Sequence, residues 1–252
     1  MIRKGGHIIM NTKQFDDGYI KDVLVRMAHH SSALEGNTIT LPETVSIILY
    51  HTVNSNRSIN MREIYEIANH EQAFDYLFYE INNDKPLTLE TLKNMHLHLT
   101  DRLQYDNGQF KEHDNAIIGA NFQTASAKET PELMLQWVDN LNYQLSHTKS
   151  EEEKIKVIVD FHIQFERIHP FSDGNDRTGR MMMNYSLLQN GLPPLIIQKE
   201  LKDEYIRVLS NIDRNAFFNF VHPLLEEEKI IMEKFMNKNK QKVQNINIVN
   251  KK

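Results

Sequence analysis

The sequence predicts an all-α protein that contains one short β-hairpin. Only nine glycines and seven prolines interrupt its 252 residues, and between these breaks apolar residues recur at spacings of three and four, the pattern of amphipathic helices. The segment 106–125 departs from this pattern. There Asn107 and Gly108 form a turn signal, and the short apolar run 116–118 ends at Gly119, which predicts a hairpin.

The first two helices are expected before residue 60. One covers about residues 17–35, where apolar side chains line one face and Gly36 is placed to end the helix as a C-terminal cap. The next helix begins after Thr40, because Thr40 and Glu43 have the spacing of a capping box.

The same apolar spacing predicts the remaining helices. Their expected ranges are 61–79, 89–102, 131–145, 151–168, a helix that begins near 176, 200–209 and 215–235. The tail 237–252 is rich in Lys, Asn and Gln and has no apolar periodicity before Ile246, so we expect it to be flexible.

The composition limits the classes of partner and chemistry. The formal net charge is -5 and charged residues make up 25% of the chain, which gives no general attraction to nucleic acid or to an anionic membrane surface. There is no cysteine, so disulfides, zinc thiolates and thiol nucleophiles are excluded. No apolar run approaches the roughly 20 residues of a membrane span. We therefore expect a cytoplasmic protein without nucleic-acid or membrane partners.

The stretch 169–180, HPFSDGNDRTGR, places a loop before the start of a helix. Free backbone N–H groups and the positive end of the helix dipole meet at such a start, and Gly174 allows a ligand to approach the main chain. Arg177 and Arg180 lie three apart on one face of the first turn, where cations oppose the dipole unless an anion is bound between them. The pattern indicates a polyphosphate site.

Three polar residues of this stretch suit the chemistry of a bound polyphosphate. Asp173 supplies a carboxylate oxygen for Mg²⁺, which commonly binds one or two carboxylates together with phosphate oxygens and water. His169 precedes a proline and is held out of helical geometry, so it can project toward the ligand and accept a proton from an attacking hydroxyl. Asn175 can cap the helix or donate from its amide.

The stretch resembles the active-site motif of the Fic (filamentation induced by cAMP) family, which usually reads HPFx(D/E)GN(G/K)R with a second arginine three residues later. Every named position matches except Asp176, where the family has Gly or Lys. The resemblance covers about residues 27–220 and implies the mainly helical Fic fold. It also implies a protein adenylyltransferase, which transfers AMP from ATP, with Mg²⁺, to a Ser, Thr or Tyr hydroxyl of a target protein or of the enzyme itself.

By this resemblance, His169 is the general base, Asp173 binds Mg²⁺, and Arg177 and Arg180 hold the β- and γ-phosphates. The hairpin becomes the flap that aligns the target side chain by strand addition, and Lys111 stands there in place of a usual arginine. The implied ATP-binding residues lie at the helix start, on the flap and in the adenine pocket: Asp173, Gly174, Asn175, Asp176, Arg177, Thr178, Gly179 and Arg180; Ile118, Gly119, Ala120 and Asn121; and Tyr205.

Glu35 stands at the C-terminus of the first predicted helix, where the helix dipole disfavours a carboxylate, so it should seek a cation. Ser31 lies four residues earlier on the same face and can donate a hydrogen bond to that carboxylate. The segment SSALEGNT resembles the (S/T)xxxE(G/N) inhibitory motif of the Fic class with an N-terminal inhibitory helix. This resemblance implies that Glu35 pairs with Arg180 and takes the γ-phosphate clamp away from ATP.

The predicted organisation has three parts. An N-terminal region with the inhibitory helix covers 1–60, the Fic catalytic core with C-terminal helices covers 61–236, and the flexible tail covers 237–252. Members of the family often dimerise, so a homodimer is a further expectation.

Three alternatives stay open. A Fic enzyme can remove AMP, act in both directions, or use another nucleotide or phospho donor. His162, Glu166 and His169 share one helical face and could instead hold the metal of a hydrolase. Asp176 also leaves room for a Fic fold that binds without turnover and serves as an interaction module.

Overall fold

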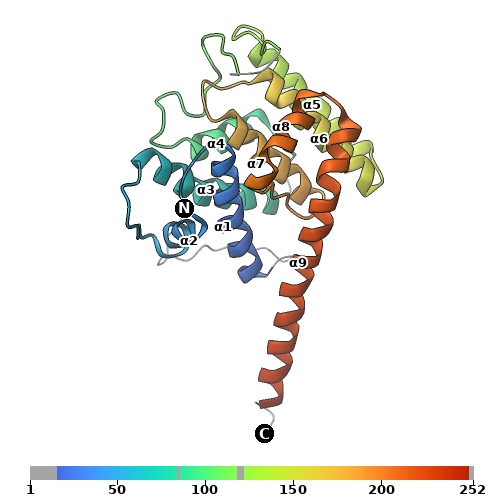
Figure 1. Cartoon of the computed structure of the whole chain (residues 1–252). Helices are drawn as coiled ribbons and strands as arrows, with labels where there is room; N and C mark the ends of the chain where they lie inside the picture. The colour runs from blue at the N-terminus through green and yellow to red at the C-terminus, as the bar shows by residue number, and fades with distance from the viewer. Residues whose placement is uncertain (1–15, 84–85, 118–121, 250–252) are drawn as a thin grey trace.

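The computed structural model describes residues 16–83, 86–117 and 122–249, and over these ranges the chain forms helices and no strand (Figure 1). The predicted all-α class is confirmed. In chain order the elements are α1 (Asp17–Leu34), α2 (Leu41–Tyr50), α3 (Met61–Asn82), α4 (Leu89–Leu99), α5 (Thr130–His147), α6 (Glu151–Ile168), α7 (Asn175–Gln189), the short 3₁₀ helix η1 (Lys199–Leu201), α8 (Lys202–Ser210) and α9 (Arg214–Val249).

Capping side chains fix the starts of α2 and α6. Thr40 Oγ1 accepts from the Glu43 backbone N–H at 3.4 Å, and the Glu43 carboxylate accepts from the Thr40 backbone N–H at 2.8 Å, so the predicted capping box is confirmed. Ser150 and Glu153 form the same box at α6. At the end of α1, Gly36 has a φ of 97°, a left-handed conformation that favours glycine.

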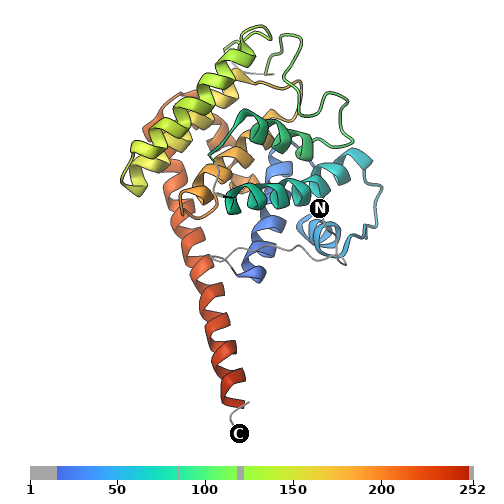
Figure 2. The same cartoon turned by 180° about the vertical axis from the view of Figure 1, so that it is seen from behind.

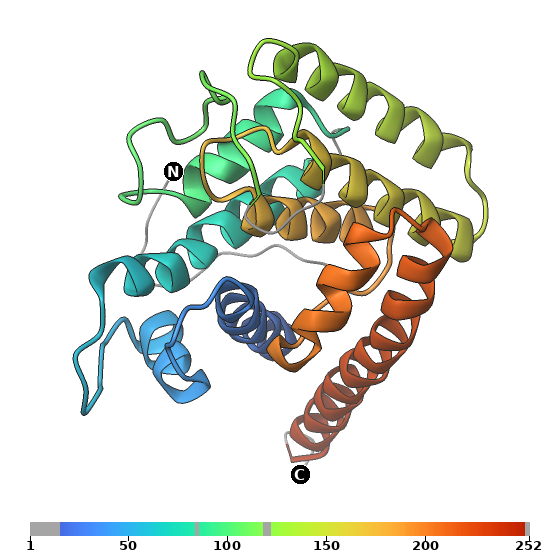
Figure 3. The same cartoon turned by 45° about the horizontal axis from the view of Figure 1, so that its top comes forward.

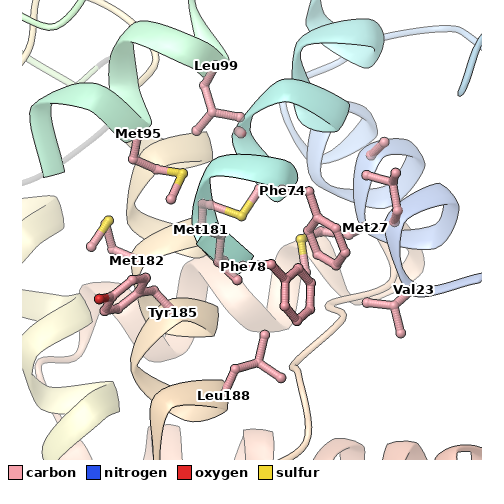
Figure 4. Close-up of a cluster of buried hydrophobic side chains, with 14 of the residues drawn as sticks. Val23, Met27, Phe74, Phe78, Met95, Leu99, Met181, Met182, Tyr185 and Leu188 are labelled. Atoms are coloured by element: carbon pink, nitrogen blue, oxygen red, sulfur yellow. The ribbon is translucent and has the colours of Figure 1, made fainter. Parts of the chain in front are cut away.

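α7 is the central helix of the fold. All of its 15 residues except Asp176 and Gln189 are buried, and it contacts α1, α3, α4 and α6. Figure 4 shows the apolar side of this packing, in which α7 faces α1, α3 and α4. The side chains of α7 are Met181, Met182, Tyr185 and Leu188. They meet Val23 and Met27 of α1, Phe74 and Phe78 of α3, and Met95 and Leu99 of α4. Because close-packed neighbours enclose the helix, the residues of its first turn are held in fixed positions.

α1 is built into this core and is also tied to the C-terminal helix. Its apolar face belongs to the same cluster as α3, α4 and α7. Near its start, Tyr19 donates to Glu228 of α9 at 2.7 Å, and Arg26 pairs with the same carboxylate at 2.8 Å. The end of α1 that carries Glu35 is therefore presented from an anchored helix.

A second apolar cluster lies where α6, α7, α8 and α9 meet, and it includes Tyr205, Phe217 and Phe220. α5 lies along α6 on the side of the molecule opposite α2 (Figure 2). Between these two helices, the Trp137 indole N–H of α5 donates to the Phe161 carbonyl of α6 at 2.8 Å.

None of the helices described has both the length and the apolar character that a bilayer crossing requires.

Two segments differ from the expectation. Within the expected hairpin, residues 107–117 and 122–125 form turns, bends and irregular segments instead of strands, and 118–121 lie outside the described residues. α9 runs to Val249, well past the expected end at 235 (Figure 1). Lys, Gln and Glu are good helix formers, and a helix that already exists can extend without a new nucleus, so the absence of an apolar stripe did not end α9.

Candidate active site

The loop between α6 and α7 carries the predicted base. α6 ends at Ile168, and His169 follows with φ 50° and ψ 61°, a left-handed conformation outside the helix. Its backbone N–H still donates to the Phe165 carbonyl at 2.9 Å. The expectation that His169 leaves helical geometry is confirmed, and Figure 3 shows this loop beside the long connection from α4 to α5.

The side chain of Asn175 closes the loop upon itself. Its Oδ1 accepts from the Phe171 backbone N–H at 2.8 Å, and its Nδ2 donates to the Phe171 carbonyl at 2.8 Å. Asn175 is only 1% exposed, so this amide is used within the protein. The donor that Asn175 leaves for a ligand is its backbone N–H group.

α7 begins without a side-chain cap among the described residues. The first backbone N–H of the helix that bonds within it is that of Thr178, which donates to the Gly174 carbonyl at 3.1 Å. Gly174 has a φ of 74°, and a Cβ atom there would lie 2.7 Å from Cγ2 of Thr100, so glycine is required for both conformation and space. Free N–H groups at a helix start form an anion site.

Glu35 reaches the two arginines of α7 from the end of α1. Arg177 Nε donates to Glu35 Oε2 at 3.0 Å, and Arg180 Nη2 donates to Glu35 Oε1 at 2.5 Å. The predicted pair with Arg180 is present, whereas the contact with Arg177 was not anticipated. One carboxylate thus occupies both cations of the predicted phosphate clamp.

Ser31 has a different partner from the one expected. Its Oγ accepts from Arg180 Nε at 2.9 Å, and its backbone carbonyl accepts from Arg180 Nη2 at 2.9 Å. The prediction that Ser31 donates to Glu35 is therefore wrong in this structure. The reason is that a buried guanidinium has five donors to satisfy, and the two oxygens of Ser31 on α1 accept from two of its nitrogens.

The two arginines are buried but not fully satisfied. Burial disfavours the cation of Arg180, but the charge of Glu35, together with those of other acidic groups nearby, outweighs burial and raises the pKa of the guanidinium. Arg177 is 1% exposed, and its Nη1 is buried with no hydrogen-bond partner within the described part of the chain. A buried donor without a partner is costly, so this atom is suited to an anionic ligand.

Asp173 supplies a carboxylate that is placed for a metal. It lies before the uncapped start of α7, and its Oδ2 accepts from Arg62 Nη2 of α3 at 2.5 Å. Burial opposes ionisation, but the contacts with Arg62 and the Gly174 N–H, together with the charge of Arg177, outweigh it and lower the pKa of Asp173. No cluster of three or more metal-ligating side chains occurs in the ranges that the structure describes. This donor set fits Mg²⁺ held together with phosphate oxygens and water, and it contradicts the alternative metal site at His162, Glu166 and His169.

Lys111 sets the electrostatic environment of His169. Its Nζ donates to the Ile168 carbonyl at 3.1 Å and to Asn115 Oδ1 at 2.8 Å. Burial, and next the charge of Lys111, lower the pKa of His169 to about 4. The imidazole is therefore neutral at pH 7, the state that can accept a proton.

His96 supports the loop, a role that no sequence pattern indicates. Its Nδ1 accepts from the Gly108 backbone N–H at 2.9 Å, so its other nitrogen carries the proton and donates to the Asp173 carbonyl at 2.9 Å. The ring stacks on Phe171 with centroids 3.7 Å apart. Burial lowers the pKa of His96 to about 4, which keeps this arrangement neutral.

The predicted flap is anchored beside the loop at both of its described ends. Asn115 Nδ2 donates to the Phe171 carbonyl at 2.8 Å, and Thr124 Oγ1 donates to the Asn115 carbonyl at 2.6 Å. The Ala125 N–H donates to the Arg167 carbonyl at 3.3 Å. The expected ligand contacts of Ile118, Gly119, Ala120 and Asn121 lie outside the described residues.

Three further predicted residues serve packing in this structure. The Thr178 hydroxyl donates to the Gly174 carbonyl at 2.8 Å, and Gly179 has no room for a Cβ atom beside the Glu166 carboxylate of α6. Tyr205 is 3% exposed, with its hydroxyl 2.8 Å from His162 Nε2. These residues affect the site by fixing the position of α7.

Comparison with known proteins agrees with the fold and the motif. Residues 86–187 match the Fic/DOC family. The chain is 26% identical over 211 residues to "Protein adenylyltransferase Fic" of Drosophila willistoni, covering 82% of this chain and 41% of that protein. It is 28% identical over 206 residues to the protein of the same name from Culex quinquefasciatus, covering 80% and 40%. The chain thus spans well under half the length of these relatives.

Two solved structures share the fold. A Fic domain containing signaling protein from Bacteroides thetaiotaomicron superposes with a TM-score of 0.71 at 22% identity, covering 89% of this chain and 90% of that one. Fic-1 from C. elegans superposes with a TM-score of 0.72 at 22% identity, covering 92% and 69%. The chain has the Fic fold and contains a Fic/DOC family domain over residues 86–187.

Proposed function

We propose that this chain is a protein adenylyltransferase, which transfers AMP from ATP to a Ser, Thr or Tyr hydroxyl and is restrained by Glu35. The observation that carries the proposal is the Glu35 carboxylate bound to both Arg177 and Arg180, next to His169 and the uncapped start of α7. The names of the curated relatives support the choice of reaction and of ATP.

The triphosphate of ATP would bind at the first turn of α7. Backbone N–H groups of this turn would receive the α-phosphate region, and Arg177 and Arg180 would hold the β- and γ-phosphates once Glu35 has left. The two guanidinium groups are already oriented by packing, so little reorganisation accompanies binding. Mg²⁺ held by Asp173 would neutralise charge on the departing pyrophosphate.

His169 would act as the general base. Its neutral imidazole takes the proton of the target hydroxyl while the oxygen attacks the α-phosphorus, and the bond from that phosphorus to the oxygen bridging to the β-phosphate breaks. Pyrophosphate leaves with its charge stabilised by Arg177 and Arg180. The flap between Asn115 and Thr124 would hold the target chain against the loop.

Glu35 would inhibit by competing with the phosphates for the same guanidinium groups. A charge-assisted hydrogen bond contributes about 1.5 to 3 kcal/mol, which corresponds to about tenfold to a hundredfold suppression. Because Glu35 contacts Arg177 as well as Arg180, both phosphate contacts are lost while it stays in place.

The test compares the parent chain, Glu35→Gly and Glu35→Gly/His169→Ala with Mg²⁺ and α-labelled ATP, followed by mass spectrometry of the protein. We expect label in the single variant, on itself or on a target, and no label in the double variant. Intact ATP binding without label in any variant would overturn AMP transfer in favour of AMP removal, another donor or a binding module, and Asp176→Gly would be the next variant.

A further inference from the structure

Arg62, in the first turn of α3, binds two carboxylates through two different nitrogens of its guanidinium. Its Nη2 donates to Asp173 Oδ2 at 2.5 Å, and its Nε donates to Glu66 Oε1 at 3.0 Å. Glu66 belongs to the same helix, whereas Asp173 belongs to the loop before α7. The guanidinium of Arg62 therefore binds the carboxylate of Asp173, which is placed for a divalent metal.

Arg62 is held in this position by the segment that follows Glu35. Asn37 Nδ2 donates to Glu66 Oε2 at 3.0 Å and to the Glu63 carbonyl at 3.0 Å. The Glu66 side chain is 13% exposed, so its two oxygens are fixed, one by Asn37 and one by Arg62. Glu66 thus orients the guanidinium toward Asp173 before any ligand arrives.

The remaining oxygen of Asp173 is also used. Oδ1 accepts from the Gly174 backbone N–H at 2.7 Å, a contact between neighbouring residues that persists while the loop keeps its shape. A metal that binds Asp173 must therefore take Oδ2 from Arg62. A dication and a guanidinium on one oxygen repel each other, so the two cannot share it.

We infer that Arg62 is a positioning residue that competes with the divalent cation for Asp173, so that Mg²⁺ binds with nucleotide only when Arg62 turns away. This inference rests on the proposed function, since it takes the site to bind a metal nucleotide. Both side chains of the pair are 48% exposed, so water screens the contact. We expect its removal to tighten metal-dependent binding about twofold to fivefold.

The experiment measures the Kd of ATP by isothermal titration calorimetry at low salt, once with Mg²⁺ and once with EDTA. The background is Glu35→Gly/His169→Ala, in which Glu35 no longer occupies the two arginines and we expect no transfer. Adding Arg62→Gln should lower the Kd about twofold to fivefold with Mg²⁺ and should not lower it with EDTA. Low salt is chosen because an exposed ion pair weakens with ionic strength.

Two further variants exclude a general charge effect. Arg57→Gln removes the same charge from the neighbouring loop, where Arg57 is 41% exposed and pairs with Glu43 at 3.2 Å, and we expect no change in the Kd. In an Asp173→Asn background the Arg62→Gln effect should vanish, because the contested carboxylate is gone.

The outcomes separate the two proposals. A Kd for ATP with Mg²⁺ that is unchanged or higher in Arg62→Gln overturns the inference, even where AMP transfer is observed. A lower Kd that depends on Mg²⁺ and on Asp173 supports the inference, and it stands even where the labelling experiment finds no transfer and the proposed function fails.

Discussion

Glu35 and Arg177 form a direct hydrogen bond, with Nε donating to Oε2 at 3.0 Å, in addition to the contact of Glu35 with Arg180. Arg177 and Arg180 are both buried, so Glu35 supplies the counter-charge for two cations that lie inside the protein and also form the proposed phosphate clamp. Removal of the carboxylate therefore affects stability and activity together.

We predict that Glu35→Gly lowers the free energy of unfolding by about 1 to 3 kcal/mol, because a buried guanidinium loses its partner. ATP should then stabilise the variant more than the parent, since its phosphates replace the missing charge. Thermal unfolding with and without Mg²⁺ and ATP measures both effects. Glu35→Gln keeps the shape of the side chain without its charge, so its stability and its stabilisation by ATP should lie between those of the parent and of Glu35→Gly. An equal shift of Tm by ATP in all three proteins contradicts the prediction.

The activity of Glu35→Gly should persist to low pH. The pKa of His169 is lowered to about 4, so the base is neutral above that value and becomes protonated as the pH falls through it. We expect kcat/KM to decline on the acid side only below about pH 5, as measured by a pH profile. An acid limb near pH 6.5 would contradict the buried environment of this histidine.

Lys111→Met should move that acid limb to higher pH. The Lys111 charge is the second cause of the low pKa of His169, after burial, so its removal favours protonation. Lys93→Met is the matched control, since the Lys93 amine lies over the Phe110 ring. The position of the limb, and not the overall rate, is the readout, because Lys111 also holds the end of α6.

Glu166→Gln should stabilise the protein, and more so at higher pH. Burial and the nearby charge of Asp176 raise the pKa of Glu166 well above its ordinary value, so the folded state holds a proton that the unfolded chain releases above about pH 4.5. Stability from this group is present at low pH and is lost as the pH rises toward the folded pKa. Glutamine does not titrate. Urea unfolding should show a larger gain at pH 8 than at pH 5, and a gain that is constant with pH contradicts the prediction.

His96→Phe should impair nucleotide binding while it keeps the stack on Phe171. The substitution removes the bonds to the Gly108 N–H and the Asp173 carbonyl and leaves both groups without this partner, at a cost of about 1 to 3 kcal/mol. We expect weaker ATP binding by calorimetry and a lower Tm. His98→Phe, on the same helix and with its ring tilted against that of Tyr76, is the control that should leave ATP binding unchanged.

The sequence predicts those features of the structure that depend on short-range patterns. Helix spacing, the Thr40–Glu43 box and the glycine stop at Gly36 depend on neighbours within a few residues, and the structure agrees with them. The motif at 169–180 also carries its own signal, because a helix start with misplaced arginines is unusual for any purpose other than binding an anion.

Contacts between distant segments could not be predicted in this way. The roles of Arg62 and His96 depend on how α3 and α4 pack against the loop, and neither residue stands in a distinctive sequence pattern. Ser31 was given the wrong partner because four-residue spacing considers only the helix on which it lies, whereas its acceptor oxygen faces Arg180 of another helix. Asn175 was expected to serve a ligand, and its amide instead closes a turn.

The enclosure of α7 has a consequence for how the molecule reports a bound nucleotide. One face of this helix meets the ligand site and the other faces meet the core, so opening the core also breaks up the site. A nucleotide that holds the first turn should therefore slow amide hydrogen exchange in α3 and α4, even at residues far from any phosphate. The exchange rates of the most protected amides would then report whether the nucleotide site is occupied.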